Sequence, residues 1–254
     1  MKLHTTRIVI LGILLLVLAQ PSWARGPAGV SNTIHNLSVT APLDPVFSTA
    51  FYRSNEDEVC IFCHTPHGGS LTGPLWNHTL SGATFTHYNS ATISTYLQGL
   101  ATNRPPNDES LLCLSCHDGT ISVYSMYNTS NDIGQPYNDN LGIGSEDTRM
   151  AWQWGGGGPD LTPDLSNDHP ISFSYNSVLA SYPYASGDPK AGALRAAAVA
   201  TGAGVRFFGT AQRVECSSCH DPHVDYLSAG NEAYAPFLVT TNTGSKLCLA
   251  CHNK

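Results

Sequence analysis

The chain has 254 residues, a formal net charge of −7 at neutral pH and a charged fraction of only 12%. Proteins that bind nucleic acid grip it with clustered Lys and Arg, and no such cluster occurs here, so nucleic acid is excluded as a partner. Glycine, proline, serine, threonine and asparagine are frequent, and this composition favours turns and loops over long helices or regular strands.

Residues 1–24 have the three-part layout of a secretory signal. Two basic residues precede a run of apolar or small residues at 8–19, and Ser22 and Ala24 place small residues at both cleavage-determining positions. Spanning a bilayer takes about 20 apolar residues, so the run is too short for a membrane helix, and a retained anchor is the less favoured alternative. The sequence therefore predicts an exported protein with no membrane span after cleavage behind Ala24.

The rest of the chain divides into four segments. They are an N-terminal arm at 25–59, a two-motif module at 60–120, a loop-rich connecting region at 121–209 and a second two-motif module at 210–254. One short helix is predicted in the connecting region, at 191–200, where alanine, the best helix former, is abundant.

All eight cysteines of the chain belong to four motifs of one form, C-x-x-C-H. The motifs are CIFCH at 60–64, CLSCH at 113–117, CSSCH at 216–220 and CLACH at 248–252. The first and third are each followed by a further histidine, and the second and fourth are each preceded by leucine. This alternation indicates an internal duplication.

C-x-x-C-H is the attachment signature of c-type haem, in which two thiols bond to the porphyrin and the adjacent histidine binds the iron. The sequence thus predicts four covalently bound haem c groups. The attaching residues are Cys60, Cys63, Cys113, Cys116, Cys216, Cys219, Cys248 and Cys251. The proximal iron ligands are His64, His117, His220 and His252.

Three other interpretations of the cysteine pairs are less favoured. Disulfides in an exported protein need no histidine at a fixed place. Structural zinc accepts Cys and His ligands, but its spacings do not require His directly after the second Cys each time. A redox dithiol of the thioredoxin type would occur once, beside a β-α-β pattern.

Four irons need up to four distal ligands, and methionine is too scarce to supply them, since the mature chain has only Met126 and Met150. Bis-histidine ligation is therefore predicted, which implies low reduction potentials. Each histidine that follows CHTP or CHDP is too close to its proximal neighbour to share its iron, so it is expected to reach a neighbouring haem. The predicted distal ligands are His35, His67, His169 and His223, with His78 in reserve and His87 left unassigned.

Several pieces resemble the exported multihaem c-type cytochromes of metal-reducing bacteria, above all the outer-surface tetrahaem cytochromes that polymerise into "nanowire" filaments. The pieces are VCIFCHTPH, PLWNH, LLCLSCHDGT, LSNDHPISF, VECSSCHDPH and LCLACHNK, which occur in the same order over most of residues 30–254. The resemblance implies a multihaem cytochrome c fold that is mostly coil, with a few short helices, minimal strand and a core organised around the four haems.

The same resemblance implies that a neighbouring subunit donates one distal ligand. His35 is the candidate donor, because it precedes Cys60 by 25 residues, a reach of up to about 80 Å when fully extended. The alternative is that His35 folds back within its own chain. Head-to-tail donation is a heterologous contact, which builds an open filament if the rotation does not close.

The expected function is electron transfer, as the repeating subunit of an extracellular filament. The alternatives are a soluble monomeric periplasmic carrier and a multihaem oxidoreductase with an open haem site. The enzyme alternative is disfavoured because six distal candidates serve four irons. The expected partners are other copies of the chain, redox proteins and extracellular acceptors. The expected location is the outer surface or the exterior, with the periplasm as the alternative.

Overall fold

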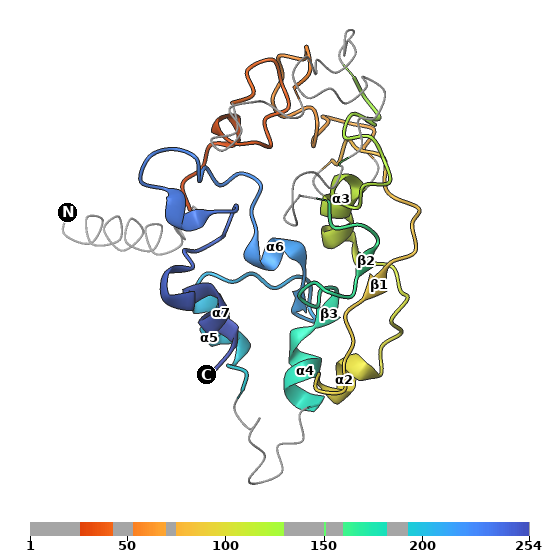
Figure 1. Ribbon diagram of the computed structural model, residues 1–254, viewed down its shortest axis with the longest axis vertical. Coiled ribbons are helices and arrows are strands. Elements are labelled where there is room, and N and C mark those ends of the chain that lie inside the picture. Colours follow the sequence, from red (N-terminus) through yellow and green to blue (C-terminus); the bar gives the residue numbers. More distant parts are fainter. Residues whose placement is uncertain are drawn as a thin grey trace, which may run out of the picture.

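The computed structural model describes residues 26–42, 53–69, 75–129, 150, 160–181 and 193–253. The predicted signal and its cleavage site lie outside these residues. The described part of the chain is mostly coil with short helices and little strand (Figure 1), which is the content that the composition predicts. No helix in this part is long and apolar enough to cross a membrane.

The regular elements are short. The α-helices are α2 (Thr95–Gln98), α3 (Asp108–His117), α4 (Tyr175–Ser181), α5 (Ala197–Gly202), α6 (Cys216–Cys219) and α7 (Lys246–Cys251). Single 3-10 turns are η1 (Val30–Asn32), η2 (Glu232–Tyr234) and η3 (Thr243–Ser245). The strands are β1 (Thr86–His87), β2 (Asp164–Leu165), β3 (Phe173–Ser174) and β4 (Arg213–Val214), with β1 parallel to β2 and β3 antiparallel to β4.

The longest helix, α3, has local reasons for its length and its end. Asp108 and Glu109 lie in its first turn, where negative charge interacts favourably with the helix dipole. The chain leaves the helix through Gly119, whose φ is +67°, a conformation that favours glycine. A Cβ on Gly119 would lie 2.6 Å from the Asp160 carboxylate, so the glycine also admits the segment that begins at residue 160.

The helix predicted at 191–200 is shifted in the structure. Helix α5 begins at Ala197 and ends at Gly202. The preceding residues are extended because their backbone pairs with the fourth motif: Arg195 N donates to Cys251 O, and Asn253 N donates to Ala193 O, each at 2.8 Å. These tertiary hydrogen bonds outweigh the helix propensity of the alanines.

The connecting region also contains α4, which the sequence did not predict, so this region has two helices and not one. Ser174 Oγ accepts a hydrogen bond of 3.1 Å from Ser177 N, as an N-cap residue does. On the helix itself, Tyr175 and Val178 are buried. The signals for this helix are therefore a capping serine and two apolar residues three apart.

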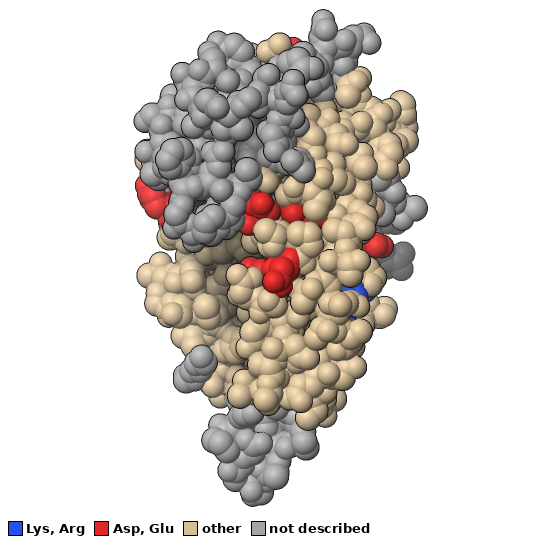
Figure 2. All heavy atoms as spheres, turned by 45° about the vertical axis from the view of Figure 1, so that its right-hand side comes forward, with Lys and Arg blue, Asp and Glu red and all other residues tan. Residues whose placement is uncertain are grey.

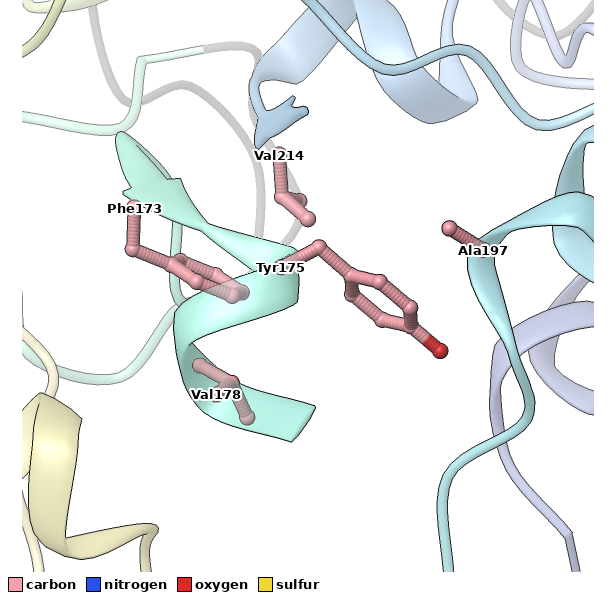
Figure 3. Close-up of a cluster of buried hydrophobic side chains, with 5 residues drawn as sticks. All are labelled: Phe173, Tyr175, Val178, Ala197 and Val214. Atoms are coloured by element: carbon pink, nitrogen blue, oxygen red, sulfur yellow. The ribbon is translucent and has the colours of Figure 1, made fainter. Parts of the chain in front are cut away.

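Many of the buried hydrophobic side chains in the described residues belong to three small clusters. The first contains Phe173, Tyr175, Val178, Ala197 and Val214. Figure 3 shows Tyr175 extending from α4 toward Ala197 at the start of α5. The second contains Phe85, Leu114 and Leu165, and the third contains Ala200, Val205 and Ala250. Each cluster includes or contacts a residue of a C-x-x-C-H motif, namely Cys251, Leu114 and Ala250 in that order.

The two modules share a backbone pattern around their first motif. Residues 63–65 pair with residues 75–77 through two hydrogen bonds of 2.9 Å, and residues 219–221 pair with residues 237–239 through bonds of 2.7 and 2.9 Å. In each case the proximal histidine forms the antiparallel bridge at the centre. The duplication that the motifs indicate thus has a counterpart in the hydrogen bonds.

Candidate haem sites

The four motifs do not share one conformation. The second motif ends α3, the third is α6 followed by its histidine, and the fourth ends α7 and continues into an extended histidine. The first lies in successive turns, in which Cys63 N and His64 N both donate to Cys60 O, at 3.2 and 2.9 Å. All eight cysteines are free thiols.

Three of the four proximal histidines each face one other imidazole. The ring centres are 6.2 Å apart for His64 and His223, 6.0 Å apart for His117 and His35, and 6.4 Å apart for His252 and His169. Each second member is one of the predicted distal ligands. The rings of the first pair are nearly parallel, at 10°, and those of the other two are nearly perpendicular, at 86° and 78°.

These separations fit an iron held between two imidazoles. A coordinating imidazole nitrogen lies about 2 Å from a first-row metal ion, and the ring centre lies about 1.1 Å further away. Two imidazoles on opposite faces of one iron are therefore centred about 6.2 Å apart. The three observed separations lie between 6.0 and 6.4 Å.

Two of these histidines have their Nδ1 beside a backbone carbonyl. His169 Nδ1 lies 2.9 Å from Pro170 O, and His220 Nδ1 lies 2.9 Å from Pro236 O. A neutral imidazole that donates its Nδ1–H keeps its lone pair on Nε2, and metal-bound histidines are commonly oriented in this way. Both rings therefore have Nε2 available for a metal ion.

His223 is oriented by a carboxylate. Its Nδ1 lies 2.9 Å from Asp221 Oδ1, and Arg206 forms an ion pair with the other Asp221 oxygen. Burial would raise the pKa of Asp221, but hydrogen bonds from His223 and Arg206 outweigh it and hold this pKa well below its usual value. A carboxylate behind a ligating histidine fixes its tautomer and increases its basicity. Asp221 was not among the residues predicted from the sequence, although it occurs two residues before His223 in CHDPH.

His35 lies beside His117 of the same chain. The arm is held against the second module by hydrogen bonds from Gly29 N to His223 O, at 2.9 Å, and from Asp225 N to Pro27 O, at 2.7 Å. Burial first, and then the nearby His117, lower the pKa of His35 to about 3, so the ring is neutral. This placement corresponds to the alternative in which His35 folds back toward a motif of its own chain.

The remaining histidines are placed differently. Both ring nitrogens of the fully buried His78 lie 2.9 Å from backbone oxygens, those of Thr79 and Ser122, which leaves no nitrogen for a metal. His87 is buried, with Nε2 3.0 Å from Arg104 O. His67 is exposed. Among the residues that the structure describes, no second imidazole faces His67 or His220 as in the three pairs.

Cysteines of successive motifs are neighbours. Burial and then the nearby Cys63 raise the pKa of Cys116 to about 12. A hydrogen bond with Cys216, and then burial, raise the pKa of Cys113 well above its usual value.

The last two motifs meet in the same way. Burial and then Cys251 raise the pKa of Cys219 to about 11. The four C-x-x-C-H motifs therefore form a continuous series from the first to the fourth.

No protein-family model matches the chain, and no curated protein is significantly similar to it in sequence. The assignment of function therefore depends on the motifs and on the geometry around them. Over the described ranges, no three His, Cys, Asp or Glu side chains come together as ligands of a single metal ion. A structural zinc site takes four such ligands, whereas a haem iron takes at most two from the protein.

Proposed function

We propose that this chain is a tetrahaem c-type cytochrome that transfers electrons and is not an enzyme. The observation that carries the proposal is the set of three histidine pairs, each joining a C-x-x-C-H histidine to a distant imidazole at 6.0 to 6.4 Å. A pair of imidazoles at this separation is what a six-coordinate haem iron requires.

Each residue type has a distinct part in holding the haems. The eight motif cysteines would form the thioether bonds, and His64, His117, His220 and His252 would bind the irons from the proximal side. His223, His35 and His169 would bind the first, second and fourth irons from the distal side. Bound haem supplies one-electron redox chemistry, at low potential when both axial ligands are histidine.

Two histidines on each of the first, second and fourth irons would leave no position there for a substrate, which favours electron transfer over catalysis at these haems. Contacts between cysteines of successive motifs favour short distances from haem to haem, because each thiol is bonded to the porphyrin edge. Haem would also supply apolar surface between the three small hydrophobic clusters of the described residues.

The signal layout favours export, to the exterior or outer surface, with the periplasm as the alternative. Redox proteins or extracellular acceptors are the proposed partners.

The first test is to produce the full chain in a host that attaches c-type haem. We expect a mass increase of four haems and, by visible and EPR spectroscopy, low-spin iron throughout. His223→Ala should keep four haems and convert one of them to high spin, because His64 loses the imidazole 6.2 Å away.

His87→Ala is the matched control, since that ring faces a backbone carbonyl and no proximal histidine. It should leave every haem low-spin. Absence of covalent haem from the wild-type protein would refute the proposal, and so would an unchanged spin state in His223→Ala.

We further propose that copies of this chain assemble through the third haem site. His220 is exposed, orients its Nδ1 toward Pro236 O at 2.9 Å and faces no second imidazole within the described residues. His67 is likewise exposed and faces none. One copy can thus supply His67 to the iron bound by His220 of the next copy. The contact is heterologous, and it extends into a filament if the rotation does not close.

A further inference from the structure

A carboxylate is buried between the second and third attachment motifs. Glu215 immediately precedes Cys216, and its side chain is fully buried. Oε1 accepts hydrogen bonds from Asn107 Nδ2 at 2.7 Å and Arg213 Nε at 3.0 Å. Oε2 accepts from two serine hydroxyls, those of Ser110 at 2.6 Å and Ser172 at 3.0 Å.

The hydrogen bonds tie this carboxylate to both motifs. Ser110 lies in α3, three residues before Cys113, and its hydroxyl also accepts a bond of 3.2 Å from Cys216 N. The thiols of Cys113 and Cys216 are hydrogen-bonding neighbours. Helices α3 and α6 are adjacent near the centre of the molecule (Figure 1). Glu215 therefore lies close to the attachment points of two haems.

The charges around Glu215 are unequally exposed. Arg213 pairs with Glu215 at 3.0 Å and with Glu109 at 2.8 Å. The Arg213 and Glu109 side chains are 30% and 29% exposed, whereas that of Glu215 is 0% exposed. A further cation, Arg104, is near enough to interact with the Glu215 charge. Water screens the two partly exposed partners, Arg213 and Glu109, more than the buried Glu215 carboxylate.

Charged side chains are scarce in this protein, at 12% of the residues. On the face shown in Figure 2, acidic side chains gather near the middle of the molecule, and most of the described surface carries no charge. In so weakly charged a protein, one unscreened charge contributes a large part of the local field. The Glu215 carboxylate lies between the second and third motifs, so its charge can affect a haem attached to either motif.

We infer that Glu215 lowers the reduction potentials of the second and third haems. Ferric haem carries one more positive charge than ferrous haem, so a fixed negative charge nearby stabilises the oxidised form more. Charge and hydrogen bonding around an iron are among the means by which proteins set its potential. The inference rests on the proposed attachment of haem, and it adds a residue that sets the energy of the two central electron sites.

The test is a redox titration of Glu215→Gln, followed by visible and EPR spectra. The amide keeps the size of the side chain and removes one negative charge. Two of the four haem potentials should rise, and the other two should stay close to the wild-type values. Glu109→Gln is the matched control, because it removes the same charge from the same arginine partner at a partly exposed position. Its effect on the two potentials should be much smaller.

Arg213→Gln gives an independent check if Glu215→Gln fails to fold. Removing the guanidinium leaves the carboxylate less compensated, so the same two potentials should fall. Unchanged potentials in a Glu215→Gln protein with four low-spin haems would overturn the inference, as would a shift in Glu109→Gln of equal size. For Arg213→Gln, unchanged or raised potentials would overturn it. A wild-type protein without covalent haem would instead refute the proposed function.

Discussion

At the residue scale, the place of each ring nitrogen separates the histidines into different roles. In His169, His220 and His223, Nδ1 lies beside an oxygen and Nε2 is left for a metal. In His78, both nitrogens lie beside carbonyl oxygens. The sequence contains PLWNH within a piece that resembles a haem protein, yet the hydrogen bonds give this histidine a structural place.

The proposed proximal ligands follow from the sequence alone, because each motif histidine is adjacent to the second cysteine of its motif. Distal ligands are harder to predict, because each observed pair joins residues far apart in the chain. Three of the distal candidates face a proximal ring, while His67 faces none among the described residues. Which candidate faces which motif depends on how the arm and the loops fold. No local spacing contains that information.

His78→Ala should destabilise the protein without changing the haem spin states. The substitution leaves a cavity at a fully buried site and removes a hydrogen bond, so we expect a loss of about 2 to 4 kcal/mol in the free energy of unfolding. Chemical denaturation with parallel visible spectra measures both quantities. His78→Gln, which retains a donor and an acceptor, should lose less. A high-spin haem in either variant would show that His78 is a ligand.

The stability difference between the wild-type protein and His78→Ala should depend on pH. Burial lowers the pKa of His78 from 6.5, although the neighbouring carbonyls act in the opposite direction. The unfolded chain therefore takes up a proton that the folded chain does not, and stability falls as the pH drops below about 6.5. Part of this loss should disappear in His78→Ala.

At the element scale, backbone pairing with the fourth C-x-x-C-H motif determines where α5 begins. Ala-rich residues predicted a helix at 191–200, but residues 193–195 pair with residues 251–253, so the helix begins only at Ala197. Helix α4 was missed because a serine cap and two apolar residues are weak signals in a chain so rich in serine. Propensity therefore predicted that a helix exists in this region, and long-range contacts set where it starts.

Ala200→Leu should destabilise the contact between α5 and α7. These helices are adjacent (Figure 1), and Ala200 is fully buried against Ala250 of the fourth motif. Overpacking costs about 1 to 3 kcal/mol, which denaturant unfolding measures. Val199→Leu is the control one residue away, because its side chain is 50% exposed and should leave stability unchanged. Equal stabilities of the two variants would contradict this packing.

At the scale of the whole molecule, the histidine pairs join distant parts of one chain. The arm meets the second motif through His35, the connecting region meets the fourth through His169, and the second module meets the first through His223. Iron bound between the members of these pairs would cross-link segments that have few regular elements. This accounts for a chain of this length with only small hydrophobic clusters in the described residues, since metal–ligand bonds can supply folding free energy directly.

His67 and His220 are exposed and belong to none of the three histidine pairs, so substitutions at these positions test self-assembly. In the haem-loaded full chain, His67→Ala should abolish assemblies seen by electron microscopy and leave monomers with one high-spin haem. His35→Met is the comparison, because it alters a ligand within the chain, keeps a side chain that binds iron and should still assemble. Normal assembly of His67→Ala with four low-spin haems would refute this donor. A monomeric wild-type protein with four low-spin haems would refute donation between copies, and it would require His220 to find its partner within its own chain.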